Sequence, residues 1–92
     1  MLKRHEPDLI KALGNSIAER RRYIAMTQQQ LADAVGVHRT YLSEIEQGKR
    51  NLSVGTLYQI AACLEISADK LLKQADLQSR VQTPNTKLKS QK

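Results

Sequence analysis

The residues from Gln28 to Gln47 form two short helical patterns on either side of a glycine, and this stretch constrains the fold most. Its apolar residues recur at spacings that place them inside the bend: Leu31, Val35, Val37, Leu42 and Ile45. Ala32 is small at the point where the two helices must cross closely. Gly36 can adopt the left-handed conformation that ends one helix and reverses the chain. The stretch therefore predicts two helices joined by a tight turn.

Apolar spacing on both sides of this stretch predicts an all-α domain of five helices without strands. A first helix is expected from about Asp8 to Ala25, following a proline that a first turn tolerates. Thr27 and Gln30 have the spacing of a capping box, which predicts the start of the second helix. The third helix is expected from about Arg39 to Gln47, and Gly48 is expected to close it.

Two further helices follow in the predicted order. Ser53 is expected to cap the fourth helix. The inner face of that helix carries Leu57, Ile60, Ala61 and Leu64. Ser67 is expected to cap a short fifth helix from Ala68 to about Gln74, which Leu71 and Leu72 anchor.

The two ends of the chain are predicted to lie outside the folded domain. Residues 1–7 form an N-terminal arm, residues 8–75 the domain, and residues 76–92 a disordered basic tail with few apolar residues. The net charge of the chain is +6, and residues 77–92 supply four of these charges without any acid. A basic chain suits nucleic acid, but a basic tail is often only a solvated end. Charge alone therefore does not establish DNA binding.

Several classes of function are disfavoured by the residues that the chain lacks. No apolar run is long enough to span a bilayer, so no membrane association is expected. A single cysteine, Cys63, excludes an internal disulfide and suits the cytoplasm. His5, His38 and Cys63 cannot supply a four-ligand zinc site. Glu44 and Glu46 face different directions on a helix and make no catalytic pair. We therefore expect no catalytic residues, no metal and no cofactor, and a binding function rather than an enzyme.

Two segments, Gln28–Gly36 and Tyr41–Asn51, resemble the lambda-repressor-like helix-turn-helix family of transcription regulators, the xenobiotic-response-element type. The resemblance covers about Leu9 to Leu72. Residues 39–43 and 45–51 are especially similar to the controller proteins of restriction–modification systems, although stand-alone regulators share them. The resemblance implies a compact five-helix DNA-binding domain at residues 8–75, with its helix-turn-helix at the second and third helices. It also implies sequence-specific binding of double-stranded DNA by a homodimer on a pseudo-palindromic operator.

The same resemblance implies which residues contact DNA. The candidates for base edges in the major groove are Arg39, Thr40, Ser43 and Glu44. The candidates for the DNA backbone are Gln28, His38, Tyr41, Lys49, Arg50 and Asn51. Glu44 is equally suited to rejecting wrong sequences. His38 stands where the family has a better N-cap, so it either contacts a phosphate or leaves the helix start frayed.

The resemblance also places Arg21 opposite Glu46, as a buried structural ion pair rather than a DNA contact. At position 20 the family often has an aliphatic residue, whereas this chain has Arg20. This departure predicts either an arginine whose aliphatic stem is buried while its charged end reaches solvent, or a locally thinner core. For the dimer interface we expect the fifth helix, with Leu71 and Leu72, and the exposed end of the fourth.

Two alternatives to this function remain open at the level of sequence. The chain could be an antitoxin-like or other protein-interaction module whose tail folds on a partner, but the tail has only Leu77, Val81 and Leu88 as apolar anchors. An enzyme would need a nucleophile and base, or a metal site, that the residues do not supply. No small-molecule effector is expected either, because about twenty residues follow the fifth helix, too few for an effector domain. Autoregulation is a further expectation, since controllers commonly regulate themselves.

Overall fold

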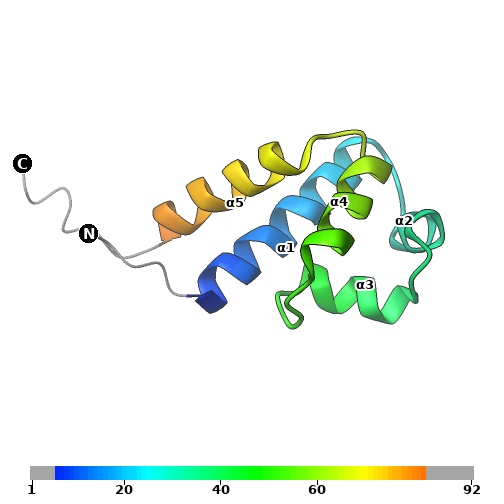
Figure 1. Cartoon of the computed structure of the whole chain (residues 1–92), viewed down its shortest axis with the longest axis horizontal. Coiled ribbons are helices and arrows are strands. Elements are labelled where there is room, and N and C mark those ends of the chain that lie inside the picture. The colour runs from blue at the N-terminus through cyan, green and yellow to red at the C-terminus, as the bar shows by residue number, and fades with distance from the viewer. Residues whose placement is uncertain (1–5, 83–92) are drawn as a thin grey trace, which may run out of the picture.

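The computed structural model describes residues 6–82, and these residues form five helices and no strand (Figure 1). The helices are α1 (Glu6–Tyr23), α2 (Gln28–Val35), α3 (Arg39–Glu46), α4 (Val54–Cys63) and α5 (Ala68–Gln82). The all-α prediction is confirmed. Residues 1–5 of the predicted arm and residues 83–92 of the predicted tail lie outside the described residues.

The core lies where α1 to α4 and the start of α5 meet. Its fully buried large side chains come from all five helices: Ile17, Leu31, Leu42, Ile45, Ile60, Leu64 and Leu71. Leu31, Leu42 and Ile45 were expected on the inside of the bend, and each is 0–1% exposed. Val35 and Val37 are half-buried and pack against the same cluster. The inner face of the helix-turn-helix is therefore fixed by the core.

The first helix differs slightly from its predicted bounds. It begins at Glu6 rather than Asp8 and ends at Tyr23 rather than Ala25. The proline in its first turn needs no backbone hydrogen bond there. Ala25 has a φ of 61°, the left-handed conformation that ends a helix, and the next amide, of Met26, donates to the carbonyl of Arg21 at 3.0 Å.

The fifth helix corrects the prediction for the start of the tail. It does not end near Gln74 but continues to Gln82, so residues 76–82 are helical rather than disordered. It lies antiparallel along α1, the blue-to-cyan helix of Figure 1. Ala75 and Ser79 are 3% and 0% exposed on α5, and α1 contributes the equally buried Ala12 and Ser16. Small residues bury little apolar area, yet they let two helices approach closely, which an apolar stripe does not reveal.

The same helix corrects the expected dimer interface. Leu71 is 0% exposed and belongs to the core, so it cannot contact a second copy from outside. Leu72, the next residue, is 47% exposed. The prediction for Leu71 was wrong because adjacent residues of a helix point in different directions, so that Leu71 faces the core while Leu72 faces solvent.

Candidate nucleic-acid interface

Both ends of α2 are formed by local hydrogen bonds that the sequence predicts. The Thr27 hydroxyl accepts from the amide of Gln30 at 3.0 Å, and the Gln30 side chain accepts from the amide of Thr27 at 2.8 Å. This is the predicted capping box. Gly36 has a φ of 88° and donates its amide to the carbonyl of Ala32 at 2.8 Å. These hydrogen bonds therefore fix where α2 begins and where it ends.

His38 caps α3 instead of leaving its start frayed. The residue is extended, with φ −72° and ψ 144°, and its Nδ1 accepts a long hydrogen bond of 3.4 Å from the amide of Thr40. The poor capping expected of histidine is thus partly overcome by the ring nitrogen.

A buried ion pair locks the far end of α3 to α1. The Arg21 guanidinium donates to both carboxylate oxygens of Glu46, with Nε–Oε2 2.7 Å and Nη2–Oε1 3.0 Å. The two side chains are only 11% and 5% exposed. Arg21 also donates to the carbonyl of Met26 at 2.9 Å, and Gln28 donates to Glu46 at 2.9 Å. The predicted pair is therefore present, and each of its two side chains makes a further hydrogen bond beside the pair.

A close approach of backbone to backbone accompanies this ion pair. A Cβ on Gly14 of α1 would meet the carbonyl oxygens of Ile45 and Glu46, the latter at 2.9 Å. Gly48 has a φ of 78°, and a Cβ on it would lie 2.8 Å from the Cα of Lys11. Only glycine at position 14 lets the end of α3 lie against α1. No local pattern predicts this role of Gly14, because its partners are about thirty residues away in the chain.

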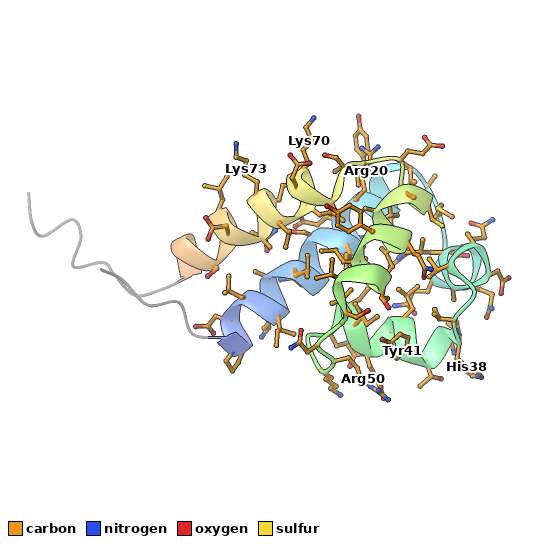
Figure 2. All side chains as sticks on the ribbon, in the orientation of Figure 1. Arg20, His38, Tyr41, Arg50, Lys70 and Lys73 are labelled. Carbon is orange, nitrogen blue, oxygen red and sulfur yellow. The ribbon has the colours of Figure 1, made fainter. Side chains whose placement is uncertain are left out.

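The outer face of α3 carries polar side chains that the core does not use. Arg39 and Thr40 are exposed, and the Ser43 hydroxyl accepts from the Gln47 amide at 2.9 Å. In Figure 2, His38 and Tyr41 lie on the lower edge of the molecule, away from Arg20, Lys70 and Lys73. The predicted base-contacting residues therefore share one exposed helix whose opposite face is buried.

The remaining predicted contacts are distributed around this helix. Gln28 is half-buried and tied to Glu46, whereas Lys49 and Asn51 are exposed in the loop that follows α3. Arg50 comes from the same loop, but its Nε donates to Glu44 Oε1 at 2.8 Å, and its guanidinium lies 5.1 Å from the centre of the Tyr41 ring. The structure thus brings Tyr41, Glu44 and Arg50 together.

Comparison with known proteins shows which family this chain belongs to. The model of the helix-turn-helix family matches residues 17–71, which include all of α2, α3 and α4. This chain belongs to that family. Control protein C.SmaI of Serratia marcescens is 33% identical over 72 residues, which are 78% of this chain and 86% of the control protein. This helix-turn-helix protein is accordingly a transcription regulator of the controller-protein type and not an enzyme.

Solved structures show that the helix-turn-helix chain has the lambda-repressor-like fold. The clp gene regulator ClgR of Corynebacterium glutamicum is similar with a TM-score of 0.81 at 29% identity, covering 89% of this chain and 87% of ClgR. The restriction-modification controller protein C.Esp1396I, solved as a tetramer with its natural 35 base-pair operator, has a TM-score of 0.70 at 31% identity. That match covers 77% of this chain and 93% of the controller protein. Within residues 6–82, none of the five helices combines the length and apolar character of a bilayer-spanning segment.

Arg20 has a structural role that the sequence did not reveal. Its Nε donates to the carbonyl of Leu64 and its Nη2 to that of Glu65, each at 2.9 Å, and it lies 5.3 Å from the centre of the Tyr23 ring. These carbonyls end α4 and have no partner within their own helix. Arg20 is therefore a charged cap for a helix more than forty residues away, and no local pattern predicts such a contact.

Proposed function

We propose that this protein binds double-stranded DNA in a sequence-specific manner, as a homodimer on a pseudo-palindromic operator. The observation that carries the proposal is the exposed polar face of α3, whose buried face is held by Leu42, Ile45 and the Arg21–Glu46 pair. A short helix held rigidly by its inner face is suited to enter a major groove. The operator complex of the similar controller protein C.Esp1396I supports the same use of the fold.

Base reading is assigned to the first turns of α3. Arg39 is exposed at the N-terminal end of the helix, where its planar fork can donate to O6 and N7 of a guanine. Thr40 and Ser43 carry hydroxyls on the same helix that can bond base edges. Glu44, the fourth candidate, acts together with the two residues that it meets in space, Tyr41 and Arg50.

Contacts with the DNA backbone are assigned to the residues before and after α3 and to Gln28. Lys49 and Asn51 are exposed in the loop after the helix, and His38 is exposed before it. Gln28 uses one hydrogen of its amide for Glu46, and the second hydrogen can donate to a phosphate near the start of α2. Contacts of this kind position the protein without reading sequence.

The homodimer follows from the size of the site. One eight-residue helix reaches only a few base pairs, so two copies related by a two-fold axis are needed for high affinity. We expect half-site centres about 34 Å apart, or a small multiple of that spacing. Leu72 is an exposed apolar residue of α5, and we assign it to the contact between copies.

Footprinting on the DNA upstream of the protein's own gene, together with selection from a random duplex pool, tests the proposal. We expect a protected pseudo-palindrome and, in sedimentation, a dimer at micromolar concentration. A monomer both free and on DNA would overturn the homodimer, and no selected sequence in the pool would overturn specific binding. A palindrome selected from the pool without protection upstream would overturn autoregulation alone.

A salt titration of two variants separates reading from positioning. Arg39→Ala should weaken binding to the cognate duplex by about 1–3 kcal/mol and relax the preference at one base pair per half-site. Lys49→Ala should weaken binding to the cognate and the scrambled duplex alike. In a dimer it should also make the slope of log affinity against log salt shallower by about 2. The assigned roles are reversed if Arg39→Ala weakens binding to both duplexes equally while Lys49→Ala abolishes the preference for the cognate duplex.

A further inference from the structure

A groove runs between α1 and α5 at the edge of the domain that lies away from α3. It consists of two adjoining hollows of about 490 and 500 Å³, which share four wall residues: Arg20, Ile66, Gln74 and Leu77. Lys70 and Lys73 line the first hollow, and in Figure 2 they lie on the upper edge of the molecule, opposite His38 and Tyr41. This α1–α5 groove therefore stays away from the proposed DNA-binding face.

The groove has an apolar wall that solvent reaches. Tyr23 of α1 and Leu77 of α5 line the second hollow and are 80% and 55% exposed. Ile66, which comes just before α5, is half-buried and packs against the hydrophobic core. Single exposed apolar residues are ordinary, but apolar residues gathered in one hollow with a polar rim are typical of an interaction site.

Contacts within the chain hold the walls of the groove in place. Arg20 donates to two carbonyls at the end of α4, each at 2.9 Å, and lies 5.3 Å from the centre of the Tyr23 ring. On the other side, the amide of Gln78 on α5 donates to the Glu19 carboxylate on α1 at 3.3 Å. A ligand that enters a groove already formed loses less affinity to the ordering of side chains.

The rim of the groove carries positive charge beside its apolar wall. Lys70 and Lys73 are exposed and three residues apart on α5, and Leu77 follows Lys73 by four, so the three side chains share one face of the helix. Two acids also line the hollows, but Glu19 accepts from α5 and Glu65 lies at the end of α4. Arg20 is bound by neutral carbonyls, which leave its charge uncompensated. The groove is therefore suited to a ligand that is both acidic and apolar.

Three other occupants match this chemistry less well. Residues 83–92 of the chain itself contain three lysines and no acid, so the rim would repel them. A second copy related by a two-fold axis through the groove would bring Lys70 and Lys73 against the same residues of its partner. Duplex DNA offers phosphates to the lysines, but its backbone has no apolar group for Tyr23 and Leu77. An acidic peptide with a leucine or an aromatic residue complements both parts.

We propose that the α1–α5 groove binds an acidic segment of a partner protein. An apolar side chain of that segment lies between Tyr23 and Leu77, and its carboxylates meet Arg20, Lys70 and Lys73. Because the groove and α3 lie at opposite edges, one chain can hold DNA and the partner at once, a consequence that rests on the proposed DNA binding. Peptide binding by the free protein does not rest on it.

The test is a selection of short random peptides, displayed on phage, by the full chain. We expect the selected peptides to be acidic and to contain leucine or an aromatic residue. A selected peptide is then labelled and titrated by fluorescence anisotropy. Lys73→Glu and Leu77→Gln should each weaken its binding by about ten-fold or more, whereas Leu77→Met keeps an apolar side chain and should retain binding. Leu77 is exposed, so thermal unfolding should be unchanged in both of its variants.

Lys11→Glu is the matched control, since it reverses the same charge at an exposed site on α1 outside both hollows. It should weaken the peptide by no more than about two-fold, because distant surface charges are screened. The inference is overturned if Lys11→Glu and Lys73→Glu have equal effects, if Leu77→Gln has none, or if the selected peptides lack acidic residues.

Two further measurements exclude the other occupants. A scrambled DNA duplex should not displace the labelled peptide, and displacement would overturn the inference by placing nucleic acid on the same cations. Sedimentation of Leu77→Gln should match that of the parental protein, and a smaller assembly would show that a second copy occupies the groove instead. Peptide binding without any sequence-specific DNA binding would overturn the proposed function and leave the groove as a binding site, which separates the two failures.

Discussion

Helix α1 packs against α3 and against α5 by different means. The C-terminal half of α1 meets α3 through a buried ion pair, Arg21 with Glu46, and α1 approaches the end of α3 through Gly14. Its N-terminal half runs beside the last turns of α5, where the buried residues are the small Ala12, Ser16, Ala75 and Ser79. The Arg21–Glu46 pair was predicted, because the sequence resembles a family that has this pair. The contact between α1 and α5 has no large or charged residue to signal it.

The difference between these contacts determines which substitutions each of them tolerates. A buried charge is stable only while its partner is present, since the survivor would be desolvated and unpaired. A contact between small residues tolerates loss of atoms better than gain of atoms, because the helices already touch. We therefore expect the ion pair between α1 and α3 to fail by deletion, and the close contacts at Gly14 and between α1 and α5 to fail by enlargement.

The largest effect is expected from Glu46→Ala. It leaves Arg21 buried without a counter-charge and removes the acceptor of Gln28, so the free energy of unfolding should fall by about 3–5 kcal/mol. Urea unfolding measures the change. Glu44→Ala, which breaks an ion pair on the surface of the same helix, is the control and should cost at most about 1 kcal/mol. Equal losses in the two variants would contradict the burial of the first pair.

A smaller loss is expected from Gly14→Ala. The added methyl group meets two backbone carbonyls at the end of α3, which cannot rotate aside, so we expect destabilisation of about 2–3 kcal/mol in thermal unfolding. Gly55→Ala is the control within the chain. Its Cβ would meet only the Ser53 hydroxyl at 3.9 Å, so it should stabilise α4 by about 0.5–1 kcal/mol. Stabilisation by both changes would show that α1 and α3 are not in close contact.

Enlargement of the α1–α5 contact should have a similar or smaller effect. Ala75→Leu inserts a larger side chain at a position that is 3% exposed, and we expect a loss of about 1–3 kcal/mol in urea unfolding. Gln74→Leu places the same side chain on the exposed face of α5 and should change stability by less than about 0.5 kcal/mol. A neutral Ala75→Leu would indicate that the second half of α5 does not pack on α1.

The smallest effect is expected at the capping box that begins α2. Thr27→Ala removes one side of the capping box and should cost about 1 kcal/mol, measured by thermal unfolding. Thr27→Ser keeps the hydroxyl and should retain most of the stability. Equal losses in the two variants would show that the methyl group of Thr27, and not its hydroxyl, supports α2.

The sequence by itself determined the features that depend on neighbours along the chain. The capping box of Thr27 and the left-handed turn at Gly36 were predicted because their partners are three and four residues away. The inner face of the bend followed from helical spacing, and Leu31, Leu42 and Ile45 are buried as expected. The pairing of Arg21 with Glu46 came from resemblance to a family and not from local pattern.

Only the tertiary structure decided the contacts that join distant segments. The cap that Arg20 provides for α4 and the glycine at position 14 require knowledge of which helices meet. The extension of α5 to Gln82 was missed because small residues carry little of the apolar signal that marks a buried face. The place of Arg50 on α3 depends on how a loop folds back, and several rotamers of a long side chain are compatible with the same sequence. Local hydrogen bonds and periodicity are written in short stretches of sequence, whereas close packing and long-range ion pairs exist only once the helices have met.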